Sequence, residues 1–125
     1  MAEKKKILLV EDDVFIKDIY FRKFSSEGFE LIEASDGEKA LRTVNENPPD
    51  LVMLDLNMPI MDGFTFLKNI KKNDKLKDTT VVILSNFSDD EKIKEAKELG
   101  VENYIVKSNF TPTEVVDKIK AILIK

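Results

Sequence analysis

Short uninterrupted apolar runs recur along the chain, and each of them ends at a polar or charged residue. Such runs are typical of strands that are buried on both faces of a parallel sheet. The clearest are Ile7–Val10, Leu51–Leu54 and Val81–Leu84. A further strand is expected at Asn103–Val106, and the more polar segment Phe29–Ala34 suits the edge of a sheet. The pattern therefore predicts five strands.

Between the predicted strands, apolar residues recur every three or four positions, which is the spacing of one helix face. Helices are expected over residues 14–27, 35–46, 62–73, 89–99 and from Thr111 to the end. Ser35–Glu38 and Thr111–Glu114 both match a capping box that starts a helix. The helix over 89–99 has the narrowest apolar stripe, so we expect it to be held least firmly against the sheet.

The first predicted helix carries more apolar side chains than one core-facing stripe needs. The expected stripe consists of Ile16, Ile19, Tyr20 and Phe24. Asp12 or Asp13 can cap the start of this helix. Phe15 and Phe21 fall outside the stripe and are expected at the surface, where scattered aromatics are common. The alternative is a docking patch, since Phe15 would lie near the acidic residues that precede the helix.

The regular alternation of strands and helices predicts an α/β fold. Helices long enough for crossovers separate the strands, which indicates a five-stranded parallel sheet with helices on both faces. Open sheets of this kind bind ligands at the carboxyl ends of their strands. The residues expected there are Glu11, Asp12 and Asp13 after the first strand, Asp55 after the third, Ser85 after the fourth and Lys107 after the fifth.

Composition narrows the chemistry that these residues can perform. The chain has 125 residues, 42% of them hydrophobic, which fits one globular domain with a packed core. It contains no histidine and no cysteine, which excludes a Ser-His-Asp triad, thiolate or imidazole metal sites and disulfides. A net charge of -4 argues against direct nucleic-acid binding and favours a protein partner or small ligand. No apolar run approaches the roughly 20 residues of a membrane span, so a cytoplasmic location is expected.

The acidic residues at the expected sheet edge favour a metal-assisted reaction. Singly, each has an ordinary explanation as a helix cap or turn residue, but carboxylates crowded into one cleft repel each other unless a cation joins them. Oxygen ligands without histidine or cysteine point to a hard ion, and we expect Mg²⁺. Asp55 ends a different, central strand and is the candidate nucleophile toward phosphorus, with Lys107 neutralising charge on the phosphoryl oxygens. The product would be an aspartyl phosphate.

Several short motifs stand in order at the predicted strand ends. They are Val10–Asp13, Leu54–Pro59 with Met61–Gly63, Leu84–Ser85 and Tyr104–Lys107. Together they resemble the motif set of the bacterial response-regulator receiver domain, the CheY-like phosphoacceptor module of two-component signalling. The resemblance spans the chain from about Lys6 and implies a single receiver domain over residues 1–125 with the flavodoxin/CheY-like (βα)5 fold. Such a domain either signals by itself or belongs to a longer regulator.

The resemblance implies a phosphotransfer role for the acidic residues. Asp55 would accept a phosphoryl group from a phosphohistidine on a sensor histidine kinase or a phosphotransfer protein. The carboxylates of Asp12 and Asp55 and the backbone carbonyl of Asn57 would ligate Mg²⁺, and Glu11 would orient a ligand water. Asp13 would be peripheral and serve as a helix cap.

The resemblance also implies a switch that a downstream protein target reads. Lys107 would pair with the Asp55 carboxylate and then with the phosphoryl oxygens, to which the Ser85 hydroxyl would donate a hydrogen bond. Movement of Ser85 would let Tyr104 turn from exposed to buried. In the family, the output face commonly consists of the helix over 89–99, the last strand and the last helix.

Two departures from the family pattern stand beside the site. Ser108 follows Lys107, where the family usually has a proline after a cis peptide bond, so either the loop enforces a cis bond or a different turn holds Lys107. Asn86 is larger than the family's usual residue, and Phe87 is bulky. Both would shield the phosphoryl group from water, and we expect a long-lived phosphate.

Three other functions compete with the receiver interpretation. A phosphatase of the haloacid dehalogenase type needs a second aspartate as general acid two residues after the nucleophile, and here that position is Asn57. A flavin or nucleotide binder would need a glycine-rich phosphate loop, which follows no predicted strand. A degenerate receiver acting as a scaffold stays open because of Ser108 and Asn86. The domain is therefore expected not to be an enzyme, beyond slow self-phosphorylation and self-dephosphorylation.

Overall fold

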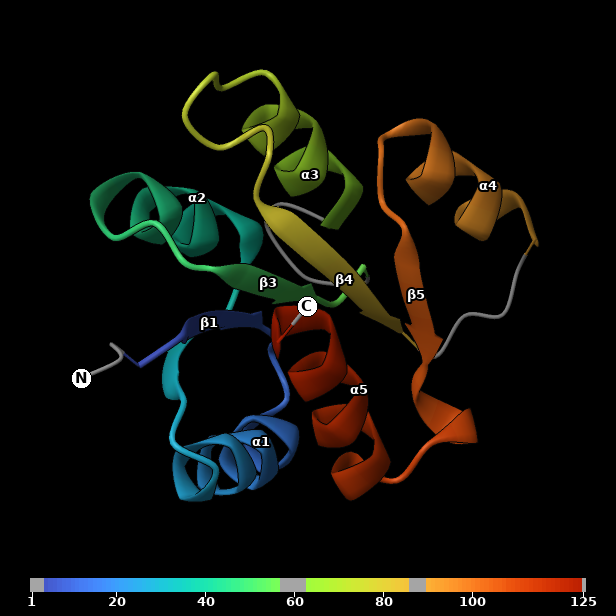
Figure 1. Cartoon of the computed structure of the whole chain (residues 1–125). Helices are drawn as coiled ribbons and strands as arrows, with labels where there is room; N and C mark the ends of the chain where they lie inside the picture. The colour runs from blue at the N-terminus through green and yellow to red at the C-terminus, as the bar shows by residue number, and fades with distance from the viewer. Residues whose placement is uncertain (1–3, 57–62, 86–89, 125) are drawn as a thin grey trace.

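The computed structural model describes residues 4–56, 63–85 and 90–124, in which strands and helices alternate (Figure 1). The strands are β1 (Lys6–Val10), β2 (Glu30–Ala34), β3 (Leu51–Leu54), β4 (Thr80–Ser85) and β5 (Asn103–Val106). The helices are α1 (Val14–Ser26), α2 (Gly37–Glu46), α3 (Gly63–Lys71), α4 (Asp90–Glu98), the short 3-10 helix η1 (Lys107–Asn109) and α5 (Pro112–Ile124). The predicted order of elements is confirmed.

All neighbouring strands are parallel, in the order β2-β1-β3-β4-β5. The fold class is therefore the predicted α/β class with a five-stranded parallel sheet, and β2 lies at an edge as expected. Val10 at the end of β1 lies beside Leu54 of β3, and Ser85 at the end of β4 lies beside Val106 of β5. The loops that follow these strands thus leave from the same end of the sheet, the end at which the strands have their carboxyl termini. This end is called the carboxyl edge below.

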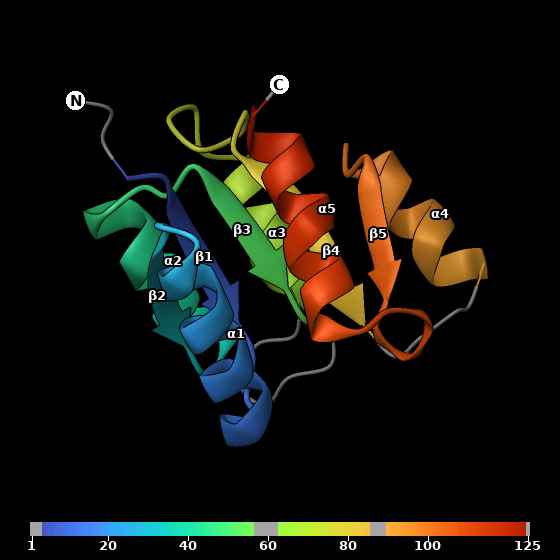
Figure 2. The same cartoon turned by 60° about the horizontal axis from the view of Figure 1, so that its bottom comes forward.

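Two hydrophobic layers enclose the sheet. Helices α1 and α5 cover one face, and α2, α3 and α4 cover the other (Figure 2). Successive residues of a strand point to opposite faces. Leu8 and Val10 accordingly pack toward α2 and α3, whereas Ile7 and Leu9 pack toward α1 and α5. Burial on both faces explains why the central strands are continuous apolar runs.

Side-chain caps fix where the helices begin. Asp13 caps α1 by accepting hydrogen bonds from the backbone N–H groups of Phe15 and Ile16, at 2.9 and 3.1 Å. In the predicted capping box of α5, Thr111 Oγ1 accepts from the Glu114 N–H at 3.2 Å, and Glu114 Oε1 accepts from the Thr111 N–H at 2.9 Å. Both predictions are confirmed.

The capping box predicted at Ser35–Glu38 is wrong by one residue. Helix α2 begins at Gly37, and the side chain of Asp36 accepts a hydrogen bond from the Lys39 N–H at 2.9 Å. Ser35 points elsewhere, since its hydroxyl accepts a hydrogen bond from the Lys17 ammonium at 3.0 Å. An aspartate caps a helix as well as a serine does, and the local sequence offered both.

The stripe predicted for α1 is narrower in the structure. Tyr20 and Phe24 are buried and Ile16 packs partly against the core, but Ile19 is 39% exposed. The buried side chains follow one another at four-residue spacing, which turns position 19 toward the rim of the helix. On α4, the predicted stripe residue Ala96 is buried and Leu99 packs beside it.

None of the helices in the described part combines the length and apolar composition that a membrane span requires.

Candidate functional site

Three carboxylates meet at the carboxyl edge of the sheet. Glu11, Asp12 and Asp55 each bring one oxygen to within 4.8 Å of the others. Backbone hydrogen bonds place the two strand-end acids, because the Glu11 N–H donates to the Ala34 carbonyl and the Asp55 N–H donates to the Val10 carbonyl, both at 3.0 Å. These bonds continue the sheet by one residue beyond β1 and β3, so the two acids are held by rigid backbone.

The three acids differ in their contact with water. Glu11 is 2% exposed, the side chain of Asp55 is 11% exposed, and Asp12 lies at the surface. The second oxygen of Glu11 accepts a hydrogen bond from the Asp12 N–H at 3.1 Å. The cluster is thus a cup with a buried acid at its base and an exposed acid at its rim.

Lys107 places one positive charge against this cluster. Its ammonium lies 2.5 Å from Glu11 Oε1 and 3.5 Å from Asp55 Oδ2, and its side chain is 14% exposed. The sequence led us to expect pairing with Asp55 alone, whereas the structure adds a shorter contact to Glu11. One ammonium therefore faces two buried or partly buried carboxylates.

The surroundings of Glu11 disfavour its charged form. Burial is the largest cause that raises the pKa of Glu11 above its ordinary value, and a hydrogen bond with the Asp55 carboxyl raises it further, while Lys107 opposes both. Close carboxyl groups share a proton or recruit a cation when one positive charge does not balance them. The electrostatics of the cup thus favour a second positive charge.

A short helical turn holds Lys107. The residues that the structure describes contain no cis peptide bond, and Lys107 opens η1, which runs to Asn109. Of the two possibilities raised by Ser108, the structure has the different turn. The Phe110 N–H donates to the Lys107 carbonyl and closes this turn at 3.3 Å.

Gly63 supports the backbone beneath Asp55, a role that sequence reasoning did not assign. A Cβ atom at Gly63 would lie 2.6 Å from the Asp55 carbonyl oxygen and 2.7 Å from the Leu56 Cα. The Gly63 N–H also donates to the Leu56 carbonyl at 3.1 Å. The first turn of α3 therefore rests directly on the backbone of Asp55 and Leu56, and only the Asp62-Gly63 pair at the start of a helix hinted at it.

The remaining predicted site residues lie at or beside the same edge. Ser85 ends β4, but its side chain lies outside the described part, and so does the whole of Asn57. Tyr104 lies on β5, is partly buried and packs against the core layer under α2, α3 and α4. Asn86, the second departure from the family pattern, and its bulky neighbour Phe87 also fall outside the described residues.

Exposed apolar side chains gather on α1, next to the cup. Among the described residues, the large hydrophobic side chains with the greatest exposure are Val14 (68%), Phe15 (80%), Ile19 (39%) and Phe21 (45%). Phe15 follows the capping residue Asp13 by two positions, so it stands close to the acidic loop. We call Val14, Phe15 and Ile19 the α1 patch.

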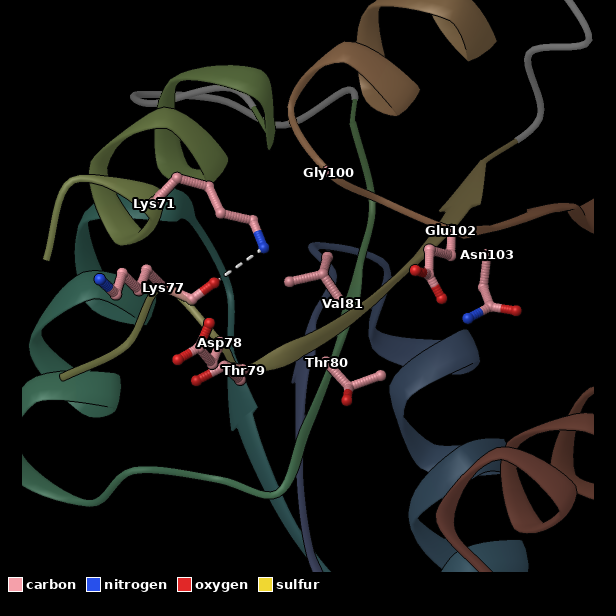
Figure 3. A pocket seen from close by; sticks show the side chains of 9 residues that line it. All are labelled: Lys71, Lys77, Asp78, Thr79, Thr80, Val81, Gly100, Glu102 and Asn103. Atoms are coloured by element: carbon pink, nitrogen blue, oxygen red, sulfur yellow. Dashed lines mark hydrogen bonds between the residues drawn. The ribbon is translucent and has the colours of Figure 1, made fainter. Parts of the chain in front are cut away.

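A hollow lies at the other end of the sheet from the cup, and Figure 3 shows the side chains that line it. It measures about 390 Å³ and lies at the amino ends of β4 and β5, where the Lys71 ammonium donates to the Lys77 carbonyl at 3.1 Å. Asp78 and Glu102 line it together with these two lysines. The four formal charges cancel, so this hollow offers no charged chemistry like that of the cup.

Comparisons with known proteins agree with this geometry. The family model of the response regulator receiver domain matches residues 7–120. The probable chemotaxis protein CheY of Rhizobium etli is 37% identical over 86 residues, which make up 68% of this chain and 67% of that protein.

Solved structures extend the similarity to the fold. The phosphorylated cyanobacterial phytochrome response regulator RcpA has a TM-score of 0.82 and 32% identity, over 96% of this chain and 91% of that one. The Mn²⁺-bound form of response regulator Rcp1 has a TM-score of 0.77 and 32% identity, over 82% of this chain and 81% of that one. The chain covers 32% and 36% of two related transcriptional regulators, about a third of their length.

Proposed function

The chain belongs to the response regulator receiver domain family, and from this membership we propose that Asp55 is its phosphoacceptor. The donor is a phosphohistidine on a sensor histidine kinase or a phosphotransfer protein. One observation carries the proposal: the Asp55 carboxylate lies 3.5 Å from the Lys107 ammonium, in the same cup as Glu11 and Asp12. The whole chain, residues 1–125, acts as one phosphoacceptor unit.

The proposed transfer needs a nucleophile and a local positive charge. An oxygen of the Asp55 carboxylate attacks the phosphorus, and the new P–O bond forms as the P–N bond breaks. The bonding electrons stay on the departing ring nitrogen, and the donor leaves as a neutral imidazole because its other ring nitrogen already carries a proton. Lys107 neutralises part of the charge on the phosphoryl oxygens. Lys107 is already within reach of Asp55, so this charge needs no large movement to act.

The donor set of the cup fits Mg²⁺. Three carboxylates without nitrogen or sulfur ligands are the chemistry that a hard cation prefers. We assign Asp12, Asp55 and the Asn57 backbone carbonyl as ligands, with Glu11 acting through a water. When bound, the ion supplies positive charge to the acceptor carboxylate and the phosphoryl oxygens. A similar protein, the response regulator Rcp1, has a solved Mn²⁺-bound form, which supports the expectation of a divalent ion.

Phosphorylation is proposed to shift the chain between two packings. The Ser85 hydroxyl donates a hydrogen bond to the phosphoryl group, and Tyr104 moves from its partly buried position to a buried one. Charge-assisted hydrogen bonds to phosphate are strong enough to bias two states that differ by about 1–3 kcal/mol. A downstream protein target reads the new surface of α4, β5 and α5. The phosphate is long-lived because Asn86 and Phe87 shield it.

The α1 patch is proposed to bind the phosphodonor. Its exposed apolar side chains lie next to the acidic loop, where the donor must approach Asp55. Aromatic residues are frequent anchors of protein interfaces. The net charge of -4 favours protein partners over nucleic acid, and the domain acts in the cytoplasm as a signalling module rather than as an enzyme.

Mass spectrometry of the intact protein tests the phosphoacceptor. After incubation with acetyl phosphate and Mg²⁺, we expect the wild-type chain to gain one phosphoryl group. Asp55→Asn should gain none, because an amide is a poor nucleophile toward phosphorus. Asp78→Asn, which changes an acid at the opposite edge of the sheet, is the matched control and should behave as the wild type does. Equal phosphorylation of Asp55→Asn would contradict the assignment.

A further inference from the structure

Lys107 and Tyr20 line the same hollow beside the cup. The hollow measures about 170 Å³ and lies between α1 and the segment that follows β5. It is lined by Ile16, Ile19, Tyr20, Lys107, Phe110 and Pro112. A lysine side chain has four torsions, and its ammonium prefers water. The walls of this hollow therefore limit how far the stem of Lys107 can move away from Glu11 and Asp55.

Of the six residues that line this hollow, Tyr20 is the one that is buried. It is 5% exposed, and its ring packs on the buried Phe24 with 6.1 Å between ring centroids. A tyrosine ring has only two side-chain torsions and, held in this way, cannot swing aside as Ile19 at the rim can. Tyr20 therefore presents a rigid surface in the space that Lys107 borders.

Tyr20 is also close enough to the cup to sense its charge. Burial and then the charge of Glu11 raise the pKa of Tyr20 to about 12. The side chain consequently remains a neutral phenol, and it adds no negative charge that would draw Lys107 away from the carboxylates.

We propose that Tyr20 is a positioning residue for Lys107: its ring limits the space beside the lysine stem and keeps the ammonium over Glu11 and Asp55. Only the expected effect on the phosphorylation rate rests on the proposed function. The position of the Lys107 ammonium is a property of the chain before any phosphoryl group arrives. Removing the ring while keeping an apolar side chain gives Lys107 room to leave the cup.

Nuclear magnetic resonance of lysine ammonium groups tests the position directly. In the wild-type chain we expect one ammonium signal protected from exchange with water, assigned to Lys107 by its loss in Lys107→Met. Tyr20→Phe keeps the ring and should keep this signal, whereas Tyr20→Leu should lose it. Ile70→Ala is the matched control, since it removes a buried side chain from α3 on the other face of the sheet. Loss of the signal in Ile70→Ala as well, or its persistence in Tyr20→Leu, would overturn the proposal.

Phosphorylation by acetyl phosphate with Mg²⁺ gives the second measurement. Tyr20→Leu should lower the rate roughly tenfold, as expected for a displaced charge near a reacting group. Tyr20→Phe should keep the wild-type rate, and Ile70→Ala should change it less than about twofold. Equal slowing in Tyr20→Leu and Ile70→Ala would show a general loss of structure and overturn the proposal. Absence of phosphorylation in the wild type would refute the proposed function, and the ammonium signal would still decide the role of Tyr20.

Discussion

At the scale of single residues, an imbalance of charge is the main property of the cup. One ammonium, from Lys107, faces the carboxylates of Glu11 and Asp55, and Glu11 is almost completely buried. The protein keeps this arrangement although an apolar residue in place of Glu11 would avoid the desolvation cost. This excess of negative charge therefore favours the binding of a cation.

Glu11→Gln tests this charge imbalance through the pH dependence of stability. The folded chain raises the pKa of Glu11, so Glu11 contributes most to stability at pH values below the pKa of the unfolded chain, and that contribution is lost as pH rises through the folded pKa. In the metal-free protein, the free energy of unfolding should fall with rising pH more steeply in the wild type than in Glu11→Gln.

Denaturant unfolding between pH 5 and pH 8 in a chelator measures this difference, with Mg²⁺ added in a parallel series. Mg²⁺ should stabilise the wild type and remove most of its extra pH dependence, since it binds the ionised form. A constant difference between the two proteins across this range would contradict the assigned cause.

Gly63→Ala tests the support beneath the acceptor. The new Cβ would approach the backbone of Asp55 and Leu56 to less than 3 Å, so this backbone or α3 must shift. We expect a loss of about 1–3 kcal/mol in stability, as in other overpacked sites, together with slower phosphorylation. Gly28→Ala is the control, because its φ of 88° strains alanine by about 1–2 kcal/mol but no atom near the cup moves. Equal phosphorylation rates in both variants would argue against the supporting role.

At the scale of helices and strands, local sequence patterns predicted which elements exist and whether each is a helix or a strand. They predicted the residues at which the elements begin and end less accurately. The apolar runs gave all the central strands, because burial on both faces leaves no polar positions. Ser35 and Asp36 could each cap α2, and only the observed hydrogen bond to Lys39 separates them. The exposure of Ile19 depends on how α1 is rotated about its own axis relative to the sheet. The spacing of the apolar residues in α1 does not specify this rotation.

The cap of α2 gives a quantitative prediction at this scale. Asp36→Ala should destabilise the chain by about 1 kcal/mol, since it removes the acceptor for the Lys39 N–H. Ser35→Ala should cost less than about 0.5 kcal/mol, because the hydrogen bond that the serine accepts comes from the Lys17 side chain and not from the backbone of α2. Thermal or urea unfolding of the two variants decides between the caps, and the reverse order of stabilities would restore the capping box at Ser35.

The α1 patch predicts a selective effect on donors. The test uses a phosphorylated histidine-kinase domain that transfers its phosphoryl group to the wild-type chain. Phe15→Ser should lower the rate of this transfer about fivefold or more, as at other aromatic anchors. The rate with acetyl phosphate should not change, because that donor is too small to need the patch. Arg42→Ser on α2, at the other face of the sheet, should alter neither rate. Equal slowing with both donors would place Phe15 in the cup rather than in the docking surface.

At the scale of the whole molecule, topology assembles the site. The acids and Lys107 lie far apart in sequence, yet parallel strands bring their ends to one edge, which is why the candidate residues could be named from the sequence. The contact of Lys107 with Glu11 and the packing of Gly63 under Asp55 could not be predicted in the same way. They depend on the path of η1 and on the approach of α3, and no local pattern specifies either.

Chemical trapping of the phosphorylated residue tests the central claim most directly. Acyl phosphates are reduced by borohydride, so the chain phosphorylated with acetyl phosphate and Mg²⁺, then reduced and digested, should contain homoserine in place of aspartate at position 55. Peptide mass spectrometry should find this change at Asp55 and not at Asp12. Homoserine at Asp12 or at another acid, or phosphate on a serine or threonine instead, would contradict the account.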